Sequence, residues 1–188
     1  MKDTPRLESA RLVLRALSRD DADALHPTLA DESLMTWWSS AAHRDVAETR
    51  AYLAFEGRAD ADQWQSWAIT VRDEGDTAVG FVSAGARRAG ISEVGYMLAR
   101  SHWGRDIAVE AVNRVIEYLF VDQDHRRVFA DTDPDNFHSR TLLEKLGFKQ
   151  EGVLRGEWET HIGVRDSVIY GLLKDEWAAR RGVALTTA

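Results

Sequence analysis

The stretch from Glu93 to Phe120, EVGYMLARSHWGRDIAVEAVNRVIEYLF, decides the fold. Its first six residues alternate, with Val94, Tyr96 and Leu98 on one side, which predicts a strand. After a polar turn, apolar residues recur at spacings of three and four, which predicts an amphipathic helix. A strand that leads through a small-residue turn into a helix directs unpaired N–H groups and the positive end of the helix dipole to one point. Such a point can bind a phosphate, although most junctions of this kind bind nothing.

The composition narrows the class of protein. At 188 residues, the chain is long enough to bury a substantial core as one domain, 1–188, with the core at about 6–177. It contains no cysteine, which excludes disulfides, thiolate zinc sites and cysteine nucleophiles. The net charge of −7 argues against nucleic acid as the main partner and loosely favours a cationic substrate such as an amine. No apolar run approaches the ~20 residues that cross a membrane, so we expect a cytoplasmic protein with no membrane partner.

The first third of the chain predicts one strand and two helices. Residues Arg6 to Leu17 alternate and predict a single strand. The sequence Ser18-Arg19-Asp20-Asp21 resembles a capping box, with aspartate in place of glutamate, and opens a helix through about Leu29. A second helix is expected from Asp45 to about Arg58. Because Trp37 and Trp38 are adjacent, they cannot both face one core, so one of them lines a groove or clamps two helices.

The rest of the chain predicts mostly strands. Polar residues and a glycine at 72–76 indicate a hairpin between strands at 65–71 and 78–84. After the central strand and helix, the expected elements are a strand at Arg127–Asp131, a helix at Ser139–Leu146 ended by Gly147, paired strands at Phe148–Trp158 and Arg165–Leu173, and a frayed tail after Trp177. This order describes a mixed α/β (α+β) domain.

Four segments in this order resemble one family. They are the strand Glu93–Leu98, the loop W-G-R-D-I-A-V-E-A at 103–111, the pair D-N-F-H-S at 135–139 with L-E-K-L-G-F at 143–148, and the final hairpin beginning E-G-V-L-R at 151–155. Together the chain is similar, from about Arg11 to Trp177, to the GNAT superfamily of acetyl-CoA-dependent N-acyltransferases, most of all to its RimJ/RimL-like branch, whose named members acetylate N-termini of ribosomal proteins. The resemblance implies the GNAT fold, a mixed, mostly antiparallel sheet of about 6–7 strands flanked by about four helices. Splayed central strands would form the acyl-CoA cleft.

The resemblance also implies acetyl-CoA as the cosubstrate. Backbone groups near Met97 and Leu98 would hold the pantetheine and polarise the thioester carbonyl as it becomes an oxyanion. Asn136 would contact the pantetheine or its neighbouring backbone. Ser139 would protonate the leaving thiolate, unless it is simply the N-cap of its helix. The pyrophosphate would bind to N–H groups of the loop residues Trp103, Gly104, Arg105, Asp106, Ile107 and Ala108.

The acceptor amine must lose a proton, so a base is needed. Glu93 and Glu157 stand where different relatives place that base, and each can equally be a solvated surface carboxylate. Trp37, Trp38 and Trp158 would shape the acceptor site, whose substrate is a protein N-terminus or a small-molecule amine. No histidine pair has metal-ligand spacing, so we expect no metal. A homodimer is a further possibility, from family habit.

One residue departs from the family pattern W-G-K/R-G-Y/I-A-x-E-A. Asp106 stands at the second glycine, whose backbone approaches the pyrophosphate. Two unit charges about 4 Å apart repel by roughly 1 kcal/mol in water and by more in a less polar setting. Either the Asp106 side chain points aside, or it fills the anion site. The second case defines an alternative function, a GNAT-fold protein with weakened or lost CoA binding that acts as a non-catalytic binding module.

Overall fold

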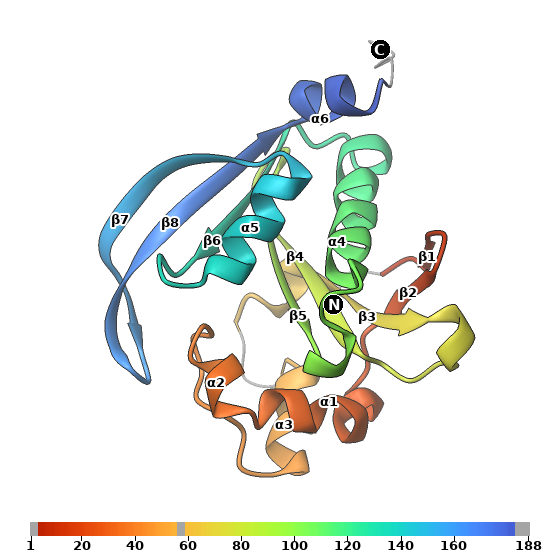
Figure 1. Cartoon of the computed structure of the whole chain (residues 1–188), viewed down its shortest axis with the longest axis vertical. Coiled ribbons are helices and arrows are strands. Elements are labelled where there is room, and N and C mark those ends of the chain that lie inside the picture. The colour runs from red at the N-terminus through yellow and green to blue at the C-terminus, as the bar shows by residue number, and fades with distance from the viewer. Residues whose placement is uncertain (1–3, 56–58, 183–188) are drawn as a thin grey trace.

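The structure is a computed structural model that describes residues 4–55 and 59–182 (Figure 1). Eight strands form one sheet in the order β1-β2-β3-β4-β5-β6-β8-β7. The strands are β1 (Leu7–Glu8), β2 (Leu12–Ala16), β3 (Trp64–Val71), β4 (Gly80–Arg88), β5 (Ile91–Leu98), β6 (Arg127–Thr132), β7 (Lys149–Thr160) and β8 (Gly163–Leu173). The α-helices of the described residues are α1 (Ala22–Leu29), α2 (Glu32–Met35), α3 (Val46–Leu53), α4 (Ile107–Glu117), α5 (Phe137–Leu146) and α6 (Lys174–Arg181).

The sheet is mixed but mostly antiparallel, as predicted. Only β5 and β6 run parallel among the pairs of the described sheet, and α4 makes the crossover between them. Strand β8 lies between β6 and β7, so β7 is an edge strand. Figure 1 shows the hairpin of β7 and β8 curving away from the rest of the sheet.

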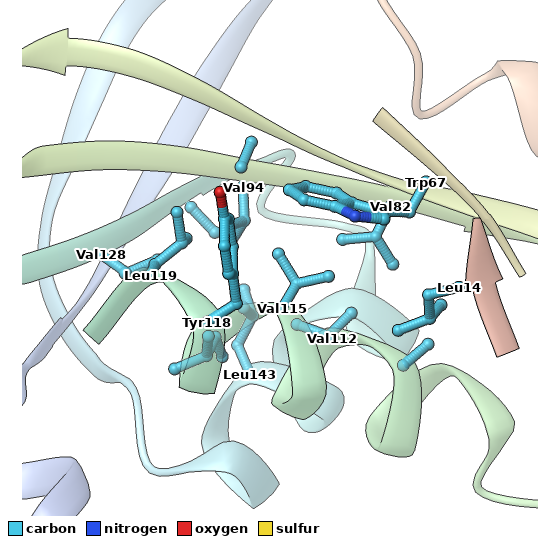
Figure 2. Packing of buried hydrophobic residues seen from close by; sticks show 14 of the residues in the cluster. Leu14, Trp67, Val82, Val94, Val112, Val115, Tyr118, Leu119, Val128 and Leu143 are labelled. Carbon is cyan, nitrogen blue, oxygen red and sulfur yellow. The ribbon is translucent and has the colours of Figure 1, made fainter. Parts of the chain in front are cut away.

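Both faces of the sheet are covered, which is why every residue of β3 is buried. On one face, Val112 and Val115 of α4 pack with Trp67, Val82 and other strand residues (Figure 2). On the other face, residues of α1 and α3 pack on Ala68, Phe81 and Met97. The predicted alternation at Glu93–Leu98 is therefore confirmed, since Val94 and Leu98 belong to the first core and Met97 to the second.

The prediction of one strand at the N-terminus was wrong. The chain turns at Ser9–Arg11 and forms the antiparallel pair β1 and β2. Alternation alone did not reveal the turn because the residues on both sides of it face the same core. Glu110 of α4 stabilises the turn by accepting hydrogen bonds from the Ser9 hydroxyl and the Arg11 backbone N–H, at 2.7 and 2.9 Å.

Helix boundaries differ from the prediction in several places, among them the start of α5, which is Phe137 rather than Ser139. The capping box at Ser18 and Asp21 is confirmed, and the helix ends at Leu29 as predicted. The second helix ends at Leu53, because Phe55 has a left-handed φ of +57°; the predicted end at Arg58 lies outside the described residues. The first part of the tail predicted after Trp177 is helical instead, since α6 continues to Arg181 and Ala178 is buried; residues 183–188 lie outside the described residues. The short helix α2, capped by Asp31, was missed.

The short elements β1, α2 and α6 explain why the sheet has more strands, and the described chain more helices, than expected. A strand of two residues and a helix of four carry too little periodicity to be recognised. No helix in the described ranges is long and apolar enough to cross a membrane.

Candidate active site

The pairing of β5 with β6 ends early, and this opens the sheet. Three residue pairs join the two strands, from Ile91 with Arg127 to Glu93 with Phe129. Strand β5 continues to Leu98 along β4, and β6 continues to Thr132 along β8. The two strands therefore diverge after Glu93, as the splayed strands of the predicted fold require.

The space between the diverging strands is a cleft of about 490 Å³, within the size range of small-molecule sites. One wall is β5 from Val94 to Leu98, and a second is the start of α4 with the loop before it. The third wall is the start of α5, with Asn136 and Ser139. We call this space the cleft.

Alternation along β5 decides which peptide groups face the cleft. The Ala99 N–H donates to the carbonyl of Val79, directly before β4, at 2.8 Å. Because successive residues of a strand direct their peptide groups to opposite edges, Leu98 and Tyr96 direct theirs to the cleft. The Trp103 indole N–H agrees with this, since it donates to the Leu98 carbonyl at 2.9 Å. Of the two residues predicted to hold the pantetheine through their backbone, Leu98 faces the cleft, and Met97 directs its peptide groups to β4.

The loop before α4 places the helix start at the cleft. Gly104 and Asp106 both have left-handed backbones, with φ of +71° and +57°, and α4 begins at Ile107. Asp106 is the N-cap residue, but its side chain makes no hydrogen bond to the helix backbone. Ile107, Ala108 and Val109 line the cleft. Uncapped N–H groups and the positive end of the helix dipole are therefore directed at this space, which suits a phosphate group.

Asp106 adopts the left-handed backbone conformation that glycine adopts readily. An L-residue in this conformation costs roughly 1–2 kcal/mol, and aspartate is among the residues that tolerate it. The carboxylate points aside, to the Lys145 ammonium of α5 at 2.6 Å. This hydrogen bond holds the pKa of Asp106 below its ordinary value, so the side chain is ionised at neutral pH. Asp106 and Lys145 both line the cleft. The ion pair with Asp106 therefore engages a lysine ammonium that could otherwise bind a phosphate.

Glu110 of α4 stabilises this loop through Arg11. Besides the β1–β2 turn, it binds the Arg11 guanidinium at 2.7 Å, and Arg11 in turn donates to the Arg105 carbonyl at 2.9 Å. Burial raises the pKa of Glu110, but the hydrogen bonds from Ser9 and Arg11 outweigh it and lower the pKa overall. Glu110, the glutamate of the loop pattern, thus has a structural role: it holds the loop against the start of the chain.

Ser139 is not the N-cap of α5. Asn136 takes that position, and its side-chain oxygen accepts a hydrogen bond from the Ser139 N–H at 3.1 Å. The Ser139 hydroxyl is therefore available for another partner, the Tyr96 hydroxyl at 2.8 Å. Desolvation raises the pKa of Tyr96 despite this hydrogen bond, so Tyr96 is a neutral phenol. Both hydroxyls lie on the wall of the cleft.

A second cavity, of about 730 Å³, meets the cleft where β5 and β6 diverge. We call it the aromatic cavity. Its described lining includes the rings Trp37, Trp38, Tyr52, Phe55, Trp64, Phe81 and Trp158. The three tryptophans predicted to shape the acceptor site thus come together here, from two distant parts of the chain. Trp38 is held by its indole N–H, which donates to the Tyr52 hydroxyl at 2.7 Å.

The two predicted bases lie in different surroundings. Glu93 lines the aromatic cavity and is bound to the Arg87 guanidinium at 2.6 Å. Glu157 is exposed on β7 and is absent from the described lining of both cavities. Trp158 and Thr160 line the aromatic cavity, so strand alternation directs Glu157 to the opposite side.

Sequence reasoning missed Asp131, Tyr96 and Lys145. Asp131 was predicted only as the last residue of a strand, with no role in the site; it is the second-last residue of β6 and lines both cavities. The signal that could have found it is the position of a carboxylate at the end of a strand parallel to β5. In the part of the chain that the structure describes, no three His, Asp or Glu side chains are grouped so as to hold a metal ion; the absence of a metal stays a prediction.

Comparison with known proteins agrees with this geometry. The family model of the acetyltransferase (GNAT) domain matches residues 11–149. The uncharacterized N-acetyltransferase p20 of Bacillus licheniformis is 32% identical, over 92% of this chain and 98% of its own. The [ribosomal protein uS5]-alanine N-acetyltransferase of Escherichia coli is 30% identical over 47% of this chain and 45% of its own. The crystal structure of spermidine N-acetyltransferase from Vibrio cholerae, in complex with CoA and spermine, has the same fold, with a TM-score of 0.75 at 19% identity over 90% of this chain and 99% of that one.

The fold and the cleft thus define an acyl-CoA-dependent transferase. The chain belongs to the GNAT family of acetyltransferases, and the similarity to the ribosomal-protein enzyme supports its RimJ/RimL-like character. Its activity is N-acetyl transfer from acetyl-CoA to an amine.

Replacing Asp106 by glycine tests the departure from the family pattern. Asp106→Gly should tighten acetyl-CoA binding about tenfold, equivalent to roughly 1.4 kcal/mol, because it removes a negative charge beside the phosphates and releases Lys145. Calorimetric titration measures the Kd. Asp124→Gly is a matched control, because Asp124 also has a left-handed φ, of +52°, and pairs with a lysine, Lys174, at 2.6 Å, but does not line the cleft. An equal change in both variants would contradict this interpretation.

Proposed function

We propose that the cleft binds acetyl-CoA, that the aromatic cavity binds a primary amine, and that the amine attacks the thioester carbonyl directly. One observation carries the proposal. The open edge of β5 and the uncapped start of α4 line one cleft, and that cleft meets a second cavity where the two strands diverge. Two substrates that enter from different sides can thus bring their reacting atoms together at one point.

The residues of the cleft have separate roles in this proposal. The N–H groups of the loop and first helical turn, from Gly104 to Ala108, bind the pyrophosphate. Peptide groups of Tyr96 and Leu98 bind the pantetheine and the thioester oxygen, whose negative charge grows during attack. The side chain of Asn136 caps α5 by accepting a hydrogen bond from the backbone N–H of Ser139. Asn136 thereby positions Ser139.

Ser139 is the proposed donor of a proton to the thiolate of CoA. The neutral Tyr96 phenol can donate a hydrogen bond to the Ser139 Oγ, which leaves the Ser139 proton available for the thiolate. The acid role is thus supported by a pair of hydroxyls rather than by one.

The acceptor is a protein N-terminus or a small-molecule amine. The E. coli relative is named as an alanine N-acetyltransferase of ribosomal protein uS5, and the V. cholerae structure holds spermine, so both classes occur among similar proteins. The alternative of a non-catalytic binding module depended on Asp106. The position of its carboxylate beside Lys145, with the helix start left uncapped, gives that alternative no support.

A bulky residue at Gly104 tests the phosphate site. Gly104→Val should weaken acetyl-CoA binding at least 100-fold, because a β-branched residue is strained at φ of +71° and its side chain would occupy open space beside the loop. Calorimetry on the folded variant measures this. Gly163→Val is the control, since Gly163 also has positive φ and open space at its Cβ position, but lies at the start of β8, far along the chain from the loop. Unchanged affinity in Gly104→Val would remove the phosphate assignment.

The proton donor is tested separately. Ser139→Ala should lower kcat about 100-fold, the lower end of general acid catalysis, with an unchanged Kd for acetyl-CoA. Tyr96→Phe should lower kcat less, because the Ser139 hydroxyl remains. Steady-state release of CoA measures both variants, and thermal unfolding confirms that they are folded. Full activity of Ser139→Ala with a good acceptor would show that the thiolate is protonated by another group.

The edge strand β7 supports a homodimer as part of the proposal. The hairpin of β7 and β8 exposes the apolar side chains Val153, Leu154, Trp158, Ile162 and Val164. Sedimentation equilibrium should give twice the monomer mass, and Val164→Glu should return the protein to a monomer. Wild-type protein that sediments only as a monomer would contradict the dimer. The cytoplasmic location stays a prediction.

A further inference from the structure

The junction of the two cavities is a small set of residues. Six described residues line both the cleft and the aromatic cavity: Trp37, Trp38, Val94, Gly95, Asp131 and Thr132. If the acetyl group lies in the cleft and the amine in the aromatic cavity, the nitrogen and the carbonyl carbon must meet beside these residues. Asp131 is the one ionisable side chain among the six. It is therefore the group that can exchange a proton with the attacking nitrogen.

Asp131 is held in place by neutral donors. One carboxylate oxygen accepts a hydrogen bond from the Trp158 indole N–H at 2.8 Å, and the other accepts one from the hydroxyl of the fully buried Ser167. The backbone of Asp131 is fixed as well, because it pairs with Ile169 on β8. Neither side-chain donor carries a charge, so these contacts orient the carboxylate without neutralising it.

The other carboxylates of the aromatic cavity are Asp60, Glu93, Asp133 and Asp166, and none of them is among the described residues that line the cleft. Glu93 is bound to Arg87, and Asp133 is bound to Arg165 at 2.7 Å. Within the described residues, the two guanidinium groups of this cavity thus pair with carboxylates other than Asp131.

The aromatic cavity also indicates the kind of amine. Its described lining contains five carboxylates and two guanidinium groups, a difference of three negative charges. The carboxylates are Asp60, Glu93, Asp131, Asp133 and Asp166, and the guanidinium groups are Arg87 and Arg165. The seven aromatic residues give this lining apolar area, and aromatic ring faces attract cations, as the Arg87 guanidinium shows over the Trp64 ring at 4.8 Å. At about 730 Å³ the cavity has the size of a small-molecule site.

We propose that Asp131 is the catalytic residue that binds the acceptor's ammonium group and takes its proton, and that the aromatic cavity selects a small cationic amine with an apolar body. This inference rests on the proposed function of the two cavities. It differs from the sequence-based expectation, which placed the base at Glu93 or Glu157.

The proton balance of the step is simple. The ammonium gives one proton to the Asp131 carboxylate, and the free amine attacks the acetyl carbon. The C–N bond forms, the C–S bond breaks, and the thiolate of CoA takes up one proton from Ser139. The nitrogen loses its second proton, which restores the Ser139 hydroxyl through solvent. Asp131 returns its proton to water, so one ammonium and one acetyl-CoA yield one amide, one CoA thiol and one proton.

The experiment compares three carboxylate variants on one set of amines. The amines are 2-phenylethylamine, spermidine, glucosamine and an alanine-terminated tetrapeptide. Asp131→Asn should keep the wild-type Kd for acetyl-CoA but lower kcat about 100-fold or more, and it should lose the fall in kcat/KM that protonation of a carboxylate causes at acid pH. Wild-type kcat/KM should be highest for 2-phenylethylamine. The two other variants are Glu93→Gln and Glu157→Gln.

Each outcome decides between the proposals. A loss of this size in Glu93→Gln or Glu157→Gln, with Asp131→Asn active, would overturn the role of Asp131 while acetyl transfer stands. A preference for the tetrapeptide or for glucosamine, or acetyl-CoA binding with no turnover of any of the four amines, would overturn the acceptor class. Failure of the wild-type protein to bind acetyl-CoA would instead contradict the proposed function itself. If Asp131→Asn does not fold, Asp131→Glu replaces it, and it should retain the acid limb of the pH profile at reduced kcat.

Discussion

The early end of the pairing between β5 and β6 is the constraint on which the site depends. Three residue pairs are enough to hold the strands parallel, and the strands then follow different partners, β4 and β8. Peptide groups that would pair with a neighbouring strand in a continuous sheet are thus directed into the cleft. Open strand edges normally invite aggregation, but here the walls made by α4 and α5 enclose the edge and turn it into a binding surface.

The second device is a strained loop held from both sides. Two left-handed residues, Gly104 and Asp106, bring the chain sharply into α4, so that its first N–H groups face the cleft. Glu110 and Arg11 hold the loop on one side, and Lys145 holds Asp106 on the other. The side chain that replaces the family's second glycine is thus held in an exposed ion pair. The same ion pair neutralises the Lys145 ammonium, which could otherwise bind the phosphates.

Sequence reasoning found the loop, the central strand and the helix because each has a strong local pattern. It also named Ser139 and the three tryptophans, which line the cleft and the aromatic cavity, although Ser139 was open to interpretation as a helix cap. The structure gives that task to Asn136, three residues earlier, and turns the Ser139 hydroxyl to Tyr96. Tyr96 and Ser139 are 43 residues apart in the chain, so no spacing could have paired them.

The sequence alone determined the order of the longer elements, the mixed sheet and the family, because periodicity, turn residues and short patterns are local properties of the chain. Only the tertiary structure decided which carboxylates meet the two cavities. In the sequence, nothing distinguishes the carboxylates of Asp131, Glu93 and Glu157 as candidate bases. In the structure, Asp131 lies at the junction of both cavities, Glu93 lies in one cavity beside Arg87, and Glu157 lies on the exposed side of β7. The reason is geometric, since the direction of a side chain depends on how distant strands pair and where that pairing ends.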